Sequence, residues 1–188
     1  MKKTLLALVT CLATCVSAFA ANPLVEIKTN MGVMRAELYP EKAPKTVDNF
    51  LQYVNENFFN GTIFHRVIDG FMIQGGGFNE KLEEKPTRAP IQNEARNGLR
   101  NEIGTLAMAR TRDPHSASAQ FFVNLVDNNR LDYPSFDGWG YAVFGKVTQG
   151  LDVVRKIGKV PTGNSGSHQN VPVKPVIIES VRLLQAGQ

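Results

Sequence analysis

Short segments in which apolar and polar residues alternate recur along most of the chain, separated by turns that contain glycine or proline. The clearest pair covers residues 24–29 and 32–38, joined by the turn-forming residues Asn30–Gly32, and is predicted to form a hairpin. Further short strands are predicted at 104–109, 120–125, 141–147 and 176–184. Because the sequence has no strand–helix–strand rhythm, this pattern predicts an antiparallel barrel or a sandwich.

Two helices are predicted beside these strands. From Pro44 onward, apolar residues recur at helical spacing, which predicts a helix with the proline in its first turn. The apolar positions of this helix are Val47, Phe50, Leu51 and Val54. A shorter helix is predicted at 151–157, and loops are predicted at 79–98, 127–140 and 158–175. The helices are expected to act as caps on the sheet.

The first twenty residues have the pattern of a secretory signal peptide. Two lysines precede an apolar run over residues 5–16, and Ala18-Phe19-Ala20 supplies small residues at the expected cleavage site. The run is too short for a membrane-spanning helix, and no later segment is long and apolar enough to span. We therefore expect residues 1–20 to be a cleaved signal peptide and residues 21–188 to form one exported, soluble domain without membrane insertion.

Lipidation at Cys15 is a less favoured alternative to simple cleavage after Ala20. Leu12-Ala13-Thr14 loosely resembles the residues before a bacterial lipidation site, but Thr14 is bulkier than the usual glycine or alanine. Cleavage would remove both cysteines, Cys11 and Cys15, so the mature chain is expected to have no disulfide and no thiol nucleophile. It would also leave 19 basic and 17 acidic residues, interspersed along the chain, which disfavours nucleic-acid binding.

The sequence lacks the motifs of several classes of site. The three histidines, His65, His115 and His168, do not have metal-binding spacing. The chain contains no Gly-x-Ser-x-Gly nucleophile motif and no Gly-Lys-Ser/Thr phosphate loop, and Gly75–Gly77 lacks the spacing of a dinucleotide loop. We therefore expect no metal and no cofactor.

The segment FHRVIDGFMIQGGG, which begins at Phe64, places a permanent cation among apolar residues. Two strands joined at Asp69-Gly70 are predicted, and side-chain alternation puts Phe64, Arg66 and Ile68 on one face, with the amide of Gln74 nearby. An arginine in apolar surroundings is costly unless it is paired or used in function. Its stem can also lie along the surface with the charged head in water. The residues alone leave both interpretations open.

Four segments in a fixed order allow a more specific interpretation of the sequence. FHRVIDGFMIQGGGF, GTLAMAR, SAQFFVNL and YAVFGKV extend over most of the chain after residue 20 and resemble the motifs of the cyclophilin family of peptidyl-prolyl cis/trans isomerases. With the signal peptide, the segments NEARNGLRN and QNVPVKPVII are most similar to the periplasmic branch of Gram-negative bacteria. The resemblance implies a mainly β fold, a closed antiparallel eight-stranded barrel capped by two α-helices, with a substrate groove on the outer face.

The resemblance also assigns roles to residues. It implies that Arg66 and Gln74 are the catalytic residues, with Gln74 and Gln120 positioning the arginine and the substrate. The implied substrate-binding residues are Phe71, Met72, Met108, Ala109, Arg110, Thr111, Gln120, Phe122, Leu131 and Tyr141. Among them, Phe71, Met72, Phe122 and Leu131 would form a proline pocket, and the backbone of 109–111 would bind the preceding residue. The residues themselves favour a core position for Met108, and without the motifs Phe71, Met72 and Phe122 would also be interpreted as core residues.

The implied activity is accelerated rotation about Xaa-Pro bonds in exported proteins of the periplasm, which assists their folding. Arg66 would form a hydrogen bond with the proline nitrogen in the twisted state. The alternative is a chaperone module that binds proline segments without turnover. Expected partners are proline-containing polypeptides, unfolded or partly folded, and a monomer is expected. Arg130 and Tyr141 stand where many cyclophilins have tryptophan and histidine, so weak cyclosporin binding at most is expected.

Overall fold

The computed structural model describes residues 21–185. The predicted signal peptide and Cys15 lie outside the described residues. The strands are β1 (Leu24–Thr29), β2 (Gly32–Leu38), β3 (Thr62–Ile63), β4 (Arg66–Ile68), β5 (Met72–Gly75), β6 (Thr105–Met108), β7 (Phe121–Asn124), β8 (Val143–Gln149), β9 (Thr162–Ser165), β10 (His168–Pro172) and β11 (Ile177–Leu183). The helices are α1 (Pro44–Asn55) and α2 (Leu151–Gly158), with short 3₁₀ helices η1 (Ala95–Asn97) and η2 (Asn129–Leu131).

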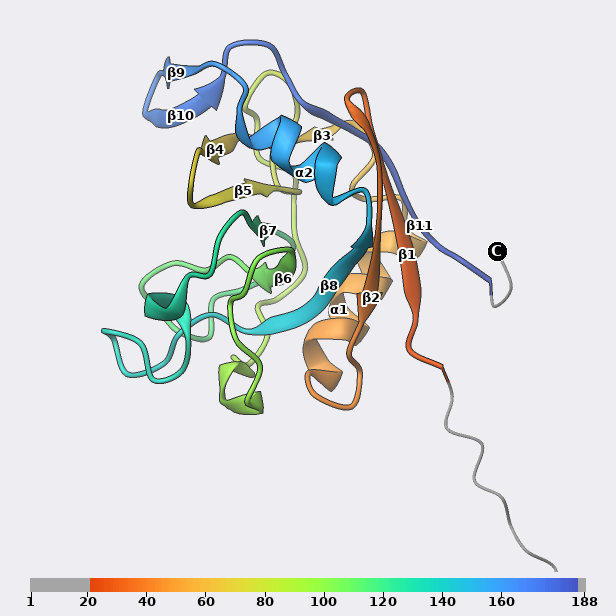
Figure 1. The fold of residues 1–188 in the computed structure, drawn as a ribbon, viewed down its shortest axis with the longest axis vertical. Helices are drawn as coiled ribbons and strands as arrows, with labels where there is room; N and C mark the ends of the chain where they lie inside the picture. The colour runs from red at the N-terminus through yellow and green to blue at the C-terminus, as the bar shows by residue number, and fades with distance from the viewer. Residues whose placement is uncertain (1–20, 186–188) are drawn as a thin grey trace, which may run out of the picture.

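Nine strands form one antiparallel sheet, which curls strongly on itself (Figure 1). Its order is β3-β11-β1-β2-β8-β6-β7-β5-β4. The two end strands, β3 and β4, are consecutive in the chain and are separated by Phe64 and His65 alone. The N–H of Ile63 donates to the carbonyl of Phe78, 2.9 Å away and just beyond β5. The bend between β3 and β4 connects the two ends of this curled sheet around the core, and the predicted mainly β, antiparallel fold with two helices is confirmed.

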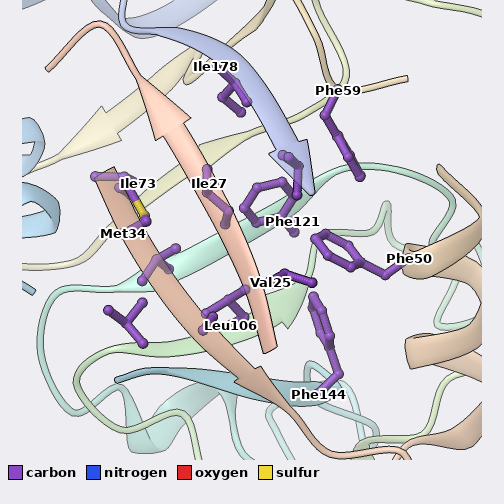
Figure 2. Packing of buried hydrophobic residues seen from close by; sticks show 14 of the residues in the cluster. Val25, Ile27, Met34, Phe50, Phe59, Ile73, Leu106, Phe121, Phe144 and Ile178 are labelled. Atoms are coloured by element: carbon purple, nitrogen blue, oxygen red, sulfur yellow. The ribbon is translucent and has the colours of Figure 1, made fainter. Parts of the chain in front are cut away.

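Aromatic side chains fill the interior of the barrel. Phe50 of α1 points between the strands (Figure 2), and its ring centroid lies 5.1 Å from that of Phe59, 5.2 Å from Phe144 and 5.6 Å from Phe121. All four rings are at most 1 % exposed. Close-packed rings of this kind contribute both buried apolar area and favourable edge-to-face contacts. The core therefore fixes the inner face of the strands.

The two helices lie against different parts of the barrel, α1 beside β11 and α2 beside β2, β4 and β5 (Figure 1). Pro44 occupies the first turn of α1, as predicted. The carboxylate of Glu94 accepts hydrogen bonds from the backbone N–H groups of Lys45 and Thr46, at 3.1 and 2.8 Å, and so satisfies the free donors at this helix start. Neither helix of residues 21–185 has the length and apolar character that a membrane span requires.

Two expectations about local structure are wrong. Phe64 does not share a face with Arg66, because Phe64 and His65 interrupt the strand and the ring of Phe64 turns inward, 6.1 Å from Phe121. The segment 158–175 is not all loop, because β9 and β10 pair within it as a separate hairpin. Every residue of β9 is exposed, so the strand has no buried face that would produce an apolar alternation.

A buried histidine connects this hairpin to the barrel. His65 is 5 % exposed, and its ring packs 4.6 Å from Phe78, which in turn packs 5.1 Å from His168 on β10. Its Nδ1 atom has no hydrogen-bond partner. Burial, with smaller contributions from the charges of His168 and Arg66, lowers the pKa of His65 to about 4. His65 is therefore neutral in the folded protein at neutral pH.

We expect stability to fall as the pH drops from about 6.5 to about 4, because in this range the unfolded chain binds a proton at His65 and the folded chain does not. The full loss would be about 3 kcal/mol, at 1.36 kcal/mol per pKa unit. Urea unfolding at pH 7.5 and 4.5 measures this loss of stability. His65→Gln should reduce the difference between the free energies of unfolding at the two pH values. An unchanged difference in His65→Gln would contradict this assignment.

Candidate active site

Four neighbouring strands align one row of side chains on the outer face of the barrel. Arg66 on β4 pairs with Gln74 on β5, Gln74 pairs with Phe122 on β7, and Phe122 pairs with Ala107 on β6. Successive residues of a strand point to opposite faces. The residues between these positions lie in the interior core and include Val67, Ile73, Phe121 and Leu106. The register thus presents a cation, an amide and an aromatic ring side by side.

A pocket of about 110 Å³ opens over this row, and we call it the inner pocket. It is lined by Arg66, Phe71, Met72, Gln74, Ala109, Arg110, Phe122, Leu131 and Tyr141. Its apolar wall belongs to a small cluster on the outer face, in which Met72 and Phe122 are buried and Phe71, Leu131 and Tyr141 pack against them. A small apolar hollow with one guanidinium and one amide at its side suits a compact apolar ring flanked by polar backbone.

A chain of hydrogen bonds runs from Arg66 through two glutamines. Arg66 Nη1 donates to Gln74 Oε1 over 3.4 Å, and Gln74 Nε2 donates to Gln120 Oε1 over 3.0 Å. The first distance exceeds the usual range for such bonds, so it orients Arg66 only weakly. Arg66 takes part in none of the salt bridges of residues 21–185. Most of its five N–H donors are therefore available to a ligand.

The glycines at the end of β5 and just after it allow neighbouring groups to approach the backbone closely. A Cβ atom at Gly77 would lie 2.4 Å from Cγ and 2.8 Å from Cδ of Gln120. A Cβ atom at Gly75 would lie 2.7 Å from the carbonyl oxygen of Ile63. Both distances are shorter than real contacts allow, so a larger residue would displace its neighbour. Gly77 therefore leaves room for Gln120 in the position from which it accepts the hydrogen bond of Gln74.

The side chain of Arg110 is structural, because all of its interactions lie within the protein. It is 2 % exposed, forms a salt bridge with Asp137, donates from Nε to the carbonyl of Gly140 at 3.0 Å, and stacks 4.4 Å above the ring of Tyr141. Burial alone would raise the pKa of Asp137, but hydrogen bonds from the backbone N–H groups of Trp139 and Gly140 and from Arg110 keep that pKa below its ordinary value. The guanidinium thereby fixes Tyr141 as a wall of the inner pocket.

Two asparagines, the buried Asn124 and the half-buried Asn128, hold the other wall, and sequence reasoning missed them. Asn128 Nδ2 donates to the carbonyl of Phe71 at 2.9 Å and to Asn124 Oδ1 at 2.7 Å. Asn124 is fully buried at the end of β7, and its Nδ2 donates to Thr105 Oγ1 at 2.9 Å. Since buried amides need partners, this network ties Phe71 to the sheet. An asparagine that ends the apolar run FFVN was the available signal.

The structure brings together most, but not all, of the residues expected at the site. Gln120 and Thr111 line a separate polar pocket of about 170 Å³, which shares Gln74, Ala109 and Arg110 with the inner pocket. Met108 is a correction: its side chain is 2 % exposed and lies in the interior core. The outward position at this point of β6 belongs to Ala107, because Ala107 is the residue paired with Phe122.

Comparison with known proteins identifies this arrangement. A family profile described as "Cyclophilin type peptidyl-prolyl cis-trans isomerase/CLD" matches residues 24–183. The chain belongs to the cyclophilin family. This confirms the resemblance seen in the sequence and makes the chain a cyclophilin-type peptidyl-prolyl cis-trans isomerase.

Two bacterial relatives and one solved structure are similar to this chain over most of their length. "Peptidyl-prolyl cis-trans isomerase B" of Escherichia coli K12 is 58 % identical over 160 residues, which are 84 % of this chain and 98 % of the relative. "Peptidyl-prolyl cis-trans isomerase A" of Dickeya dadantii is 50 % identical over 188 residues, 98 % of each chain. A crystal structure of a Cryptosporidium parvum cyclophilin is 27 % identical, with a TM-score of 0.71 over 87 % of this chain and 98 % of its own.

Two further expectations concern ligands of the cyclophilin site. No group of three histidine, cysteine, aspartate or glutamate residues within 21–185 is placed to hold a metal ion. Arg130 is exposed on η2, and the single tryptophan, Trp139, packs against Arg96 and His115 and does not line the inner pocket. Weak cyclosporin binding stays a prediction, as does the monomeric state.

We expect Gly77→Ala to lower kcat/KM for a short Xaa-Pro peptide about tenfold, because the added methyl group displaces Gln120 and removes the acceptor that orients Gln74. A double-mutant cycle tests whether Gly77→Ala acts through Gln120. If it does, adding Gly77→Ala to a Gln120→Ala protein should cost little further activity. Gly163→Ala is the matched control, since a Cβ atom there meets nothing within 4 Å. Additive losses in the cycle would show that Gly77 acts by another route.

Proposed function

We propose that Arg66 catalyses the isomerisation by donating a hydrogen bond to the proline nitrogen while the Xaa-Pro bond is twisted. The inner pocket would hold the proline ring against Phe122 and Met72, and the backbone of residues 109–111 would bind the preceding residue. The observation that carries the proposal is the position of Arg66. It stands at the side of an apolar pocket, in register with Gln74, and has no carboxylate partner within 21–185.

The chemistry needs no acid, base or covalent intermediate. Amide resonance gives the Xaa-Pro bond double-bond character, and rotation must overcome roughly 18 to 20 kcal/mol. Twisting the bond localises the lone pair on the proline nitrogen, which then becomes a hydrogen-bond acceptor. A guanidinium placed to donate to this nitrogen stabilises the twisted state more than either planar state, and such differential binding lowers the barrier.

The required stabilisation is within reach of this site. Uncatalysed isomerisation takes tens to hundreds of seconds, so millisecond turnover needs an acceleration of about 10⁴ to 10⁵. This equals about 5.5 to 7 kcal/mol. A hydrogen bond to a charged group contributes about 1.5 to 3 kcal/mol in water and more in a site from which water is excluded. Exclusion of water by Phe122, Met72 and Leu131 would supply much of the remainder.

A binding module that holds proline segments without turnover is the rival function. The same inner pocket would serve it, because an apolar hollow for a proline ring is useful with or without catalysis. The free donors of Arg66 favour the enzyme, since they are available for a hydrogen bond with the proline nitrogen in the twisted state. The two functions predict different effects on turnover and on peptide binding when the guanidinium is removed.

We expect Arg66→Ala to reduce kcat/KM for a short Xaa-Pro peptide by about 10² to 10³, the loss that follows when one donor to a developing charge is removed. Arg66→Lys should recover only part of the activity, because an ammonium group lacks the fork that can contact Gln74 and substrate together. Exchange of the peptide's cis and trans signals, followed by NMR without a coupling protease, measures both effects.

Arg155→Ala is the matched control for these variants, because Arg155 is exposed on α2 and takes part in no salt bridge of residues 21–185. It should retain full activity. Undiminished turnover in Arg66→Ala would refute the proposed mechanism. Peptide binding without turnover in the wild-type protein would establish the rival module.

The proposed substrates are exported proteins whose folding is limited by slow Xaa-Pro bonds. The basis is the signal-like pattern of residues 1–20. Expressed in a Gram-negative host, the full chain should appear in the periplasm with a mass that corresponds to cleavage after Ala20. Cys15→Ala should be processed in the same way. Retention in the cytoplasm would contradict export, and membrane attachment that is lost in Cys15→Ala would establish lipidation.

A further inference from the structure

A larger pocket adjoins the inner pocket, and we call it the outer pocket. Its volume is about 500 Å³, and it is lined by Arg110, Thr111, Arg112, Phe136, Asp137 and Tyr141. Arg110 and Tyr141 line both pockets, so the stacked pair they form is a shared wall. The loop between β7 and β8, which carries Phe136, extends away from the barrel at this point (Figure 1). A polypeptide bound in the inner pocket would therefore pass the mouth of the outer pocket.

The polar groups of the outer pocket are mostly satisfied within the protein. Arg110 donates to the carbonyls of Gly140 and Thr111, both at 3.0 Å, and forms a salt bridge with Asp137. Asp137 also accepts hydrogen bonds from the backbone at 139 and 140. These groups gain little from a polar ligand, because their hydrogen-bonding capacity is already used. Apart from the exposed side chain of Arg112, what the pocket offers a ligand is its apolar surface.

Phe136 is an exposed apolar residue in the lining of the outer pocket. It is 85 % exposed, whereas the phenylalanines of the barrel interior are at most 1 % exposed. A phenylalanine left in water beside a substrate groove forgoes the burial that would stabilise the fold, and a ligand with an apolar face can restore it. Tyr141 also lines the outer pocket. Two aromatic rings thus border a space that is large enough for a third.

We propose that the outer pocket binds the side chain of the residue immediately before the proline and that Phe136 makes this enzyme prefer a large aromatic side chain there. This inference rests on the proposed function, in which the backbone of 109–111 binds that residue. Arg110 and Thr111 belong to this segment and line the outer pocket as well. A side chain that leaves the bound backbone on the Tyr141 side enters the outer pocket directly.

Arg112 adds a second element of specificity. It is exposed, lines the outer pocket and takes part in no salt bridge within residues 21–185, whereas the charge of Arg110 is compensated by Asp137. The pocket therefore carries one uncompensated positive charge. A lysine before the proline is repelled by it, and an aromatic ring gains from it because cations are attracted to ring faces.

The experiment compares peptides Ala-Xaa-Pro-Ala in which Xaa is phenylalanine, alanine or lysine, with kcat/KM measured by NMR exchange. Wild type should favour phenylalanine over alanine about fivefold, in the range that one aromatic pair provides. Phe136→Ala should reduce this ratio to about one. Arg112→Ala should raise the lysine-to-alanine ratio about threefold. Because Phe136 is exposed, its truncation leaves the packing of the barrel intact.

Val173→Ala is the matched control, since Val173 is 69 % exposed and lines neither the inner nor the outer pocket. It should leave the ratios unchanged. The proposal is overturned if wild type shows no preference for phenylalanine, if the preference survives in Phe136→Ala, or if it appears only for Phe-Ala-Pro-Ala, where the ring is one residue further away. Each of these outcomes leaves turnover measurable, whereas failure of the proposed function would abolish turnover of all peptides in wild type or leave it intact in Arg66→Ala.

Discussion

The cross-strand register of β4, β5, β7 and β6 is the constraint on which the site depends. It places Arg66, Gln74, Phe122 and Ala107 in one row on the outer face, although they come from four separate parts of the chain. A shift of one residue in any pairing would turn that strand's contribution toward the interior. Such a shift is opposed by the inner face, because Phe121 would have to leave a packed group of rings and Phe122 would have to enter it. Core packing therefore determines the geometry of the site.

Alternation along the strands was the part of this arrangement that the sequence could reveal. The bounds of β1 and β2 agree with the predicted segments, because each has a buried and an exposed face. The same rule placed Phe64 on the face of Arg66, and there it failed, because the barrel closes at Phe64 and His65 and the chain must bend between β3 and β4. β9 was missed because it pairs only with β10 in a separate hairpin and all of its residues are exposed, so burial left no pattern in them.

The residues of the candidate site could be predicted where the family motif and the alternation along the strand agree. Motif resemblance selected Arg66, Gln74 and Phe122, and the register brings them together. It also selected Met108, although alternation places that side chain in the core. The contacts of Arg110 with Asp137, Gly140 and Tyr141 could not be foreseen, because they join the end of β6 to an irregular loop whose path depends on turns and on buried amides. Periodicity carries no information about such loops.

The contrast between the two arginines of the inner pocket has a physical meaning. Arg110 is engaged by a carboxylate, two carbonyls and a ring, so its position is fixed and three of its five N–H donors are used within the protein. Arg66 has a single long hydrogen bond to a neutral amide. A carboxylate partner would hold Arg66 more firmly, but it would also compete with the proline nitrogen for the same donors and neutralise the charge that acts on it. A neutral amide, itself held by Gln120, orients the guanidinium while leaving its charge and most of its donors free. In the proposed mechanism, the glutamine chain is therefore better suited to Arg66 than an ion pair would be.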